Sequence, residues 1–133
     1  MNVNLAVLAD YANVTQEGKL NIMGTFDNIY ADKFPCVHPE MKLVMQVEAS
    51  ISEVGHSHQI EVILMAADGA RLFSVKGQVQ VGEVKPGTLF KANNILNIRG
   101  LKFDQPGEFE FKILINGEER KSVPLKVLKI GNT

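Results

Sequence analysis

The stretch that decides the fold is Leu101–Ile130, which reads L-K-F-D-Q-P-G-E-F-E-F-K-I-L-I-N-G-E-E-R-K-S-V-P-L-K-V-L-K-I. Apolar residues occupy alternate positions from 109 to 115 and again from 123 to 127. In an extended chain this alternation turns one set of side chains toward a core and the other toward water. Asn116-Gly117 stands between the two runs, and this dipeptide tolerates the positive φ angles of a tight turn. The stretch therefore predicts a hairpin whose apolar face needs an opposing layer from upstream.

The beginning of the chain predicts a second strand pair. Leu5–Val14 and Lys19–Tyr30 mix β-branched, small and apolar residues, and Thr15-Gln16-Glu17-Gly18 between them is typical of a hairpin loop. Beyond Gly24 the apolar parity shifts, since Leu20 and Ile22 alternate but the later apolar residues do not continue the pattern. We expect a bulge or bend near Gly24-Thr25.

The middle of the chain carries the clearest alternation. Apolar residues take the odd positions of Met41–Ile51 and the even positions of Gln59–Ala66, so we expect these segments to pair as an antiparallel hairpin. A further strand runs to Val81, and Phe90–Phe103 is a strand in which no single parity accounts for the apolar residues. Short strands without any helical period predict an all-β fold. We expect one domain over residues 1–133, an antiparallel two-sheet β-sandwich of about eight strands that is immunoglobulin-like.

Both ends of the chain resemble a known family. The run L-A-D-Y-A-N-V-T-Q-E-G-K-L-N-I-M-G-T-F-D-N-I near the start, and the closing G-L-x-F-x-x-P-G-x-F-x-F strand with its N-G turn, are similar to a family of small uncharacterised prokaryotic and phage-associated domains. The motifs are mostly turn and core positions. The resemblance implies a β-sandwich and brings no catalytic residue or cofactor.

Composition narrows the classes of partner. The 133 residues are 45% hydrophobic and 22% charged, and the net charge of −1 provides no field that would attract nucleic acid or an anionic membrane. We therefore expect no nucleic acid and no membrane partner, and no segment is long and apolar enough for a membrane span or a signal peptide. The single cysteine, Cys36, cannot form an internal disulfide, which favours a reducing, cytoplasmic location.

Cys36, His38, His56 and His58 are the only set that suggests a metal, because cysteine and histidine are zinc ligands. In the predicted hairpin His56 and His58 lie at the turn, whereas His38 lies on the order of 45 Å away along an extended strand. We therefore expect no structural metal, although His56 and His58 alone could share a face.

Asp10 and Tyr11 are polar residues inside an apolar strand. We expect Asp10 to accept hydrogen bonds from neighbouring backbone donors and Tyr11 to pack its ring with the hydroxyl at the rim. The sequence has no nucleophile elbow, no cysteine protease signature and no glycine-rich phosphate loop. We expect neither a catalytic residue nor a cofactor.

One candidate interaction patch follows from the predicted central hairpin. Val44, Ile63 and Met65 would point outward and lie close together, with polar residues around them. Two readings remain: the patch is an interface, or the segment from Ala70 to Gly87 or another loop covers it. The leading hypothesis is a non-catalytic interaction or assembly module with a protein partner or a second copy of itself. The alternatives are a small-ligand or carbohydrate-binding sandwich, against which the absence of tryptophan counts, and an enzyme with an atypical site.

Overall fold

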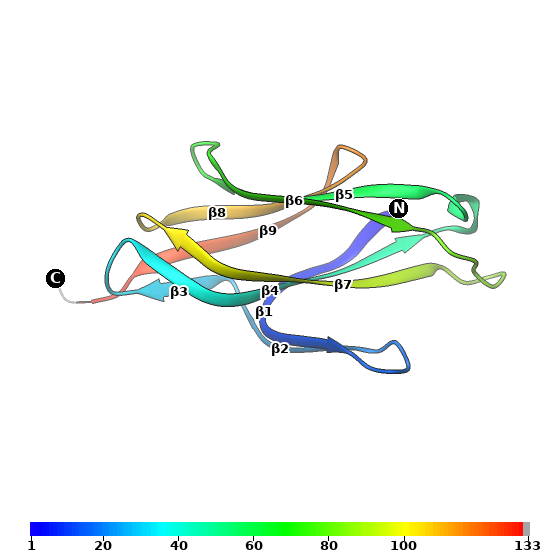
Figure 1. Cartoon of the computed structure of the whole chain (residues 1–133), viewed down its shortest axis with the longest axis horizontal. Coiled ribbons are helices and arrows are strands. Elements are labelled where there is room, and N and C mark those ends of the chain that lie inside the picture. The colour runs from blue at the N-terminus through cyan, green and yellow to red at the C-terminus, as the bar shows by residue number, and fades with distance from the viewer. Residues whose placement is uncertain (132–133) are drawn as a thin grey trace.

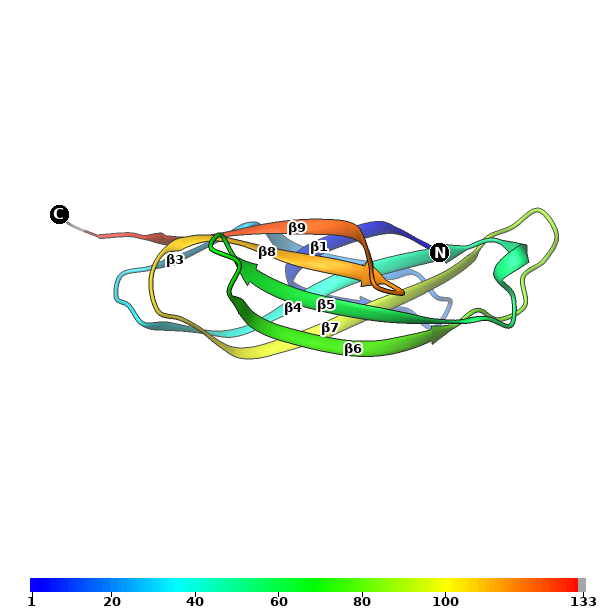
Figure 2. The same ribbon diagram turned by 90° about the horizontal axis from the view of Figure 1, so that it is seen from above.

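The computed structural model describes residues 1–131, and within them the chain forms two β-sheets packed face to face. Figure 1 shows the two layers from the side, with β5, β6 and β8 above β4 and β7, and Figure 2 shows them from above. The strands are β1 (Asn2–Val14), β2 (Leu20–Phe26), β3 (Asn28–Ala31), β4 (Cys36–Ala49), β5 (Ser57–Ala66), β6 (Arg71–Gln80), β7 (Phe90–Phe103), β8 (Gly107–Ile115) and β9 (Glu118–Lys129), with a 3-10 turn η1 (Ile51–Glu53) between β4 and β5. The prediction of an all-β, two-sheet fold is confirmed.

The number of strands and their pairing differ from the prediction. The four-stranded sheet has the order β2-β1-β4-β7 and the five-stranded sheet the order β3-β9-β8-β5-β6, which makes nine strands in residues 1–131 instead of about eight. All neighbours are antiparallel except β3 and β9, which pair in parallel. The parallel pair arises because the chain passes at Asp27 from the edge of one sheet to the edge of the other, where β3 runs along β9.

The predicted final hairpin is confirmed. β8 and β9 pair antiparallel around Asn116 (φ 51°) and Gly117 (φ 85°), and the positive φ angles explain why asparagine and glycine stand there. The side chain of Asn116 also accepts a hydrogen bond from the backbone N–H of Gln59, at 2.9 Å. The turn is thereby tied to the neighbouring strand β5.

The predicted central hairpin is wrong. β4 pairs with β1 and β7, whereas β5 pairs with β6 and β8 in the other sheet. Between them η1 carries the chain across the sandwich. Alternation predicts only that one face of each strand is buried, and two strands that face each other across a core bury the same residues as two that lie side by side.

The core lies between the two sheets. Met41, Leu43 and Val47 of β4 are fully buried on one face, and Phe111, Ile113 and Leu125 are fully buried on the other. Phe103 and Phe109 meet edge to face with their ring centroids 5.0 Å apart.

The inward face of β7 changes along the strand, which explains why its sequence shows no single parity. Leu96 and Ile98 lie opposite Leu43 and Met41, but beyond Gly100 (φ 66°) the buried residues are Leu101 and Phe103. β4 changes face at the same level, near Pro39.

The β1–β2 hairpin forms a second, smaller core on the outer face of the four-stranded sheet. Figure 1 shows it below β4 and β7, on the side away from the five-stranded sheet. A hydrogen bond of 3.3 Å from the Asn93 side chain to the Gly18 carbonyl holds the tip of the hairpin against β7. We expected a bulge or bend near Gly24-Thr25; Gly24 has a φ of 71°, but the β1–β2 register does not shift there and β2 continues to Phe26, with the bend at Asp27. The buried residues of this core are Ala9, Ala12 and Val44, with Val7, Leu20, Ile22 and Ile95 packed around them.

Candidate functional site

The two lateral sides of the sandwich are built differently. On one side, which we call the closed side, the chain itself joins the sheets as β2 passes into β3. On the other, which we call the open side, β6 and β7 are the edge strands of their sheets and neither pairs with the other. Within residues 1–131, each of these two strands therefore has one row of backbone N–H and C=O groups without a strand partner.

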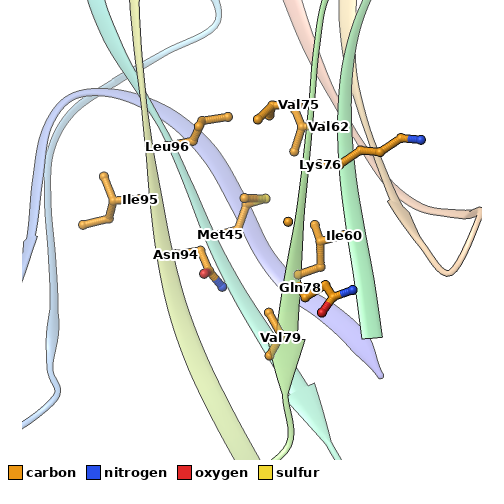
Figure 3. A pocket seen from close by; sticks show the side chains of 11 residues that line it. Met45, Ile60, Val62, Val75, Lys76, Gln78, Val79, Asn94, Ile95 and Leu96 are labelled. Carbon is orange, nitrogen blue, oxygen red and sulfur yellow. The ribbon is translucent and has the colours of Figure 1, made fainter. Parts of the chain in front are cut away.

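A cleft of about 230 Å³ lies between the sheets on the open side, and we call it the edge cleft (Figure 3). Figure 3 shows Met45, Val62, Val75 and Leu96 gathered between the strands, whereas Lys76 points away from them. The four-stranded sheet contributes Met45, Asn94 and Leu96 from its inner face, and the five-stranded sheet contributes Ile60, Val62, Val75, Gly77 and Val79.

Gly77 is the residue that leaves the space open. It lies opposite Ile60 on the inward parity of β6, between Val75 and Val79. A Cβ atom at this position would meet no atom within 4 Å. Glycine in the interior of a strand weakens the strand and often marks a place that another group approaches. Gly77 does not have a positive φ, so its backbone does not require glycine, and the missing side chain leaves the edge cleft open.

Asn94 brings a polar group to this apolar wall. It lies opposite Met45, so it belongs to the inward parity of β7. Its Nδ2 atom is buried, and within residues 1–131 it has no hydrogen-bond partner. A buried donor without a partner costs free energy, on the order of 1–3 kcal/mol. An acceptor atom entering the cleft would recover part of that cost.

A polar cluster closes one end of the open side. The carboxylate of Glu53 accepts a hydrogen bond from the amino group of Met1, at 2.6 Å, and this bond holds the pKa of Glu53 below its ordinary value. His58 Nε2 lies 3.3 Å from the same carboxylate without the alignment of a hydrogen bond, and its Nδ1 is 2.9 Å from Asn116 Nδ2. The backbone of Val81 bonds to Gly55 and His56 beside this cluster, which anchors the loop between β6 and β7.

The candidate patch of Val44, Ile63 and Met65 does not form. Val44 belongs to β4 and is covered completely by the β1–β2 hairpin, whereas Ile63 and Met65 belong to β5 in the other sheet. Ile63 is only 3% exposed on the outer face, between Ser74 and Lys112. The segment from Ala70 does not cover it, because β6 pairs beside β5 in the same sheet. The patch depended on a pairing of β4 with β5 that is absent from residues 1–131.

The metal-ligating residues are divided between the two ends of β4. Cys36 and His38 lie at its start, where His38 faces the ring of Phe26 with centroids 6.0 Å apart. His56 and His58 lie beyond η1, after the strand has ended. Within residues 1–131 no three His, Cys, Asp or Glu side chains come close enough to share a metal ion.

Asp10 differs from the expectation, whereas Tyr11 lies half exposed with its hydroxyl at the surface. Asp10 is exposed, and in the part of the chain that the structure describes its carboxylate takes part in no hydrogen bond or ion pair. The prediction that it satisfies backbone donors is therefore wrong. Tyr11 is 50% exposed beside Met23, and its hydroxyl accepts a hydrogen bond of 3.3 Å from the Asn13 side chain.

The edge cleft was missed in the sequence although a signal was present. Phe73, Val75, Val79 and Val81 share one parity, and Gly77 is the single gap in that series. A gap shows only that a side chain is missing. The gap at Gly77 becomes a cleft because β6 is an edge strand that faces the other edge strand, β7. The periodicity of the sequence does not show which strands lie at the edges of the sheets.

The comparison with solved structures found a likeness to part of a larger protein. The chain matches part of "Pseudomonas fluorescens alkylpurine DNA glycosylase AlkC bound to DNA containing an abasic site analog", with 12% identity and a TM-score of 0.48, over 92% of this chain and 30% of that one. The chain thus spans less than a third of that structure's length. We withdraw the exclusion of nucleic acid partners, because this similar structure holds DNA. A likeness at this level carries no argument about what the present chain binds.

The sequence shows no membrane-spanning helix in the described residues, has no match among curated proteins, and matches one family model. No helix within residues 1–131 has the length and apolar character that crossing a membrane requires. The comparison with curated proteins gave no match. A family model matches residues 4–128, nearly the whole chain, and includes both resembling stretches noted above. The chain therefore belongs to DUF6941, a family of unknown function.

Proposed function

We propose that this protein is a non-catalytic binding module whose open side holds an extended segment of a partner protein. The segment would pair with the free edge of β6 and insert alternate apolar side chains into the edge cleft. The observation that carries the proposal is the position of an apolar hollow directly beside an unpaired strand edge.

The size of the cleft favours side chains over a separate small ligand. Sites for drug-sized molecules usually have volumes of about 300–1,000 Å³ and enclose most of the ligand. The edge cleft measures about 230 Å³ and lies along a strand edge. A volume of this size suits a few apolar side chains that arrive on a backbone lying outside the cleft.

The polar groups around the cleft suit a peptide backbone. The outer edge of β6 presents donors and acceptors at the spacing of a β-ladder, which is how segments add to exposed sheets in β-augmentation. The unpartnered Nδ2 of Asn94 adds a donor at the opposite wall. An extended segment supplies carbonyl acceptors as well as alternating side chains, so one occupant meets both requirements.

We further propose that the sandwich is of the immunoglobulin-like subtype and that the protein is cytoplasmic. The orders β1-β4-β7 and β9-β8-β5-β6 correspond to A-B-E and G-F-C-C′ of an immunoglobulin-like sandwich, which supports that subtype. A single free cysteine supports a reducing, cytoplasmic location.

The test uses ten-residue peptides with apolar residues at alternate positions, and fluorescence anisotropy measures their binding. We expect Gly77→Val to abolish binding, because the new side chain fills the cleft. The same variant should unfold at equal or higher denaturant concentration, since valine suits a strand better than glycine. The matched control is Ser74→Val, which adds the same side chain to β6 on its outward parity.

Two results would overturn the proposal. One is that Gly77→Val binds the same peptides with unchanged affinity. The other concerns a peptide that carries proline at each position whose backbone N–H would point toward β6. Proline cannot donate a hydrogen bond to a strand ladder, so binding as tight as that of the parent peptide would contradict the pairing.

A further inference from the structure

A second hollow, of about 310 Å³, lies on the closed side where β2 passes into β3. We call it the crossing hollow. It is remote from the edge cleft, because β2 and β3 are the edges opposite β7 and β6 in their sheets. Its lining residues are Asp10, Gly24, Thr25, Phe26, Asn28, Ile29, Tyr30 and His38.

The carboxylate of Asp10 is the charged group of this hollow. It has no hydrogen bond or ion pair within residues 1–131, and no lysine or arginine lines the hollow. Gly24, opposite Asp10, makes room for it, since a Cβ on Gly24 would lie 2.7 Å from Asp10 Oδ2. The positive φ of Gly24 adds a second reason for glycine at this position. The site thus keeps an uncompensated negative charge in a concave place.

Three aromatic rings share the hollow with this carboxylate. Tyr30 is 57% exposed, and its hydroxyl accepts a hydrogen bond of 3.3 Å from the Asn28 side chain. Phe26 and His38 lie together with their ring centroids 6.0 Å apart. The faces of aromatic rings carry partial negative charge and attract cations. Carboxylate and rings therefore favour the same kind of ligand.

We propose that the crossing hollow binds a compact organic cation of the alkylammonium type, held by the Asp10 carboxylate and by the ring of Tyr30. The inorganic alternative is disfavoured, because no second carboxylate lines the hollow and a hard metal ion needs several oxygen ligands. A methylated ammonium group is weakly hydrated and can use both an aromatic face and a single negative charge.

This cation could reach the hollow as a free small molecule or as the modified lysine side chain of a protein. The test therefore has two arms, tetramethylammonium chloride and the blocked amino acid Nα-acetyl-trimethyllysine amide. Heteronuclear NMR titration follows the Asn28 side-chain amide and the Gly24 backbone amide, both of which lie at the hollow. Neutral tert-butanol has nearly the same shape as tetramethylammonium and controls for apolar binding.

We expect the cations to shift these two amides and tert-butanol to leave them unchanged. Asp10→Asn should weaken binding about two- to fivefold, as for an exposed ion pair, and added salt should weaken it further. Tyr30→Leu should weaken it by a similar factor. The control is Asp32→Asn, which removes an exposed carboxylate outside the hollow and should leave the affinity unchanged.

Comparing the two ligands also shows whether the bound cation is a free small molecule or a lysine side chain of a protein. Tighter binding of the lysine derivative than of tetramethylammonium would assign a protein side chain, and the reverse would assign a free cation. Equal binding of tert-butanol, or equal affinities of Asp10→Asn and Asp32→Asn, would overturn the proposal. Neither result bears on the edge cleft, whose test uses other variants on other strands.

Discussion

The closed side and the open side of this sandwich join the same two sheets by different means. On the closed side the chain runs from β2 to β3, and Ile29 in β3 reaches the main core and is only 6% exposed. On the open side the chain passes from β6 to β7 through the loop of residues 81–89, beyond the ends of both strands, and Val75 on the inward parity of β6 remains 36% exposed.

The closed side contributes apolar burial that stabilises the free protein, whereas the open side keeps apolar surface that a partner could cover. Ile29 on the closed side is already removed from water, so its burial contributes to the stability of the free protein. Val75 on the open side is only partly removed from water, so a partner could still gain by covering it. The charged residues of β6, such as Arg71 and Lys76, oppose unspecific pairing of this long edge.

The largest effect is expected from Val44→Glu, which tests whether the β1–β2 hairpin really seals the outer face next to the closed side. The new carboxylate would replace a fully buried side chain among alanines and Ile95. We expect a loss of about 3 kcal/mol or more in the free energy of unfolding, measured with urea. Val37→Glu on the same strand is the control, because Val37 is exposed, and should change stability by less than about 0.5 kcal/mol. Similar losses in both variants would show that the hairpin does not cover Val44.

The direct comparison of the two sides uses truncation to alanine. Ile29→Ala should cost about 2–4 kcal/mol, because it removes buried methyl groups from the core at the crossing. Val75→Ala should cost less than about 1 kcal/mol, since the side chain is already partly in water. Equilibrium denaturation gives both values, and equal costs would break the distinction between the sides.

A turn that belongs to neither side provides a reference. Gly117→Val should cost about 1–3 kcal/mol, because the φ of 85° is strained for a β-branched residue although the space around it is open. Glu118→Val, one position further on, should stay within about 0.5 kcal/mol of wild type. A thermal melt compares them, and an unchanged midpoint for Gly117→Val would contradict the turn geometry.

The smallest effect concerns the polar cluster that closes one end of the open side. The pKa of Glu53 is lowered in the folded protein, first by its hydrogen bond from the amino group of Met1, so its charged form stabilises the fold. Glu53→Gln should therefore cost about 0.5–1 kcal/mol at neutral pH. A depressed carboxyl pKa contributes stability above the unfolded value, and this is lost as the pH falls through the folded value. The difference between wild type and Glu53→Gln should hence shrink below about pH 4, and a difference that grows in acid would contradict this sign.

Local chemistry in the sequence was enough for the elements and their turns. The alternation around Phe111 and the Asn116-Gly117 dipeptide predicted the β8–β9 hairpin, and the parity break after Ile22 pointed to an unusual backbone at Gly24, whose φ is 71°. These features depend on neighbouring residues only, so a single sequence contains them.

Only the tertiary structure decided which strands face each other and which lie side by side. The regular alternation of β4 and β5 suits a hairpin and a pair of opposing sheets equally well, and the chain crosses between sheets at η1. The patch of Val44, Ile63 and Met65 was lost with that hairpin. The gap at Gly77 became a cleft because β6 and β7 are both edges, and Asp10 lines the same hollow as three aromatic rings because β1, β2, β3 and β4 meet at the crossing. Such juxtapositions depend on contacts between residues far apart in the chain, which the periodicity of each segment does not record.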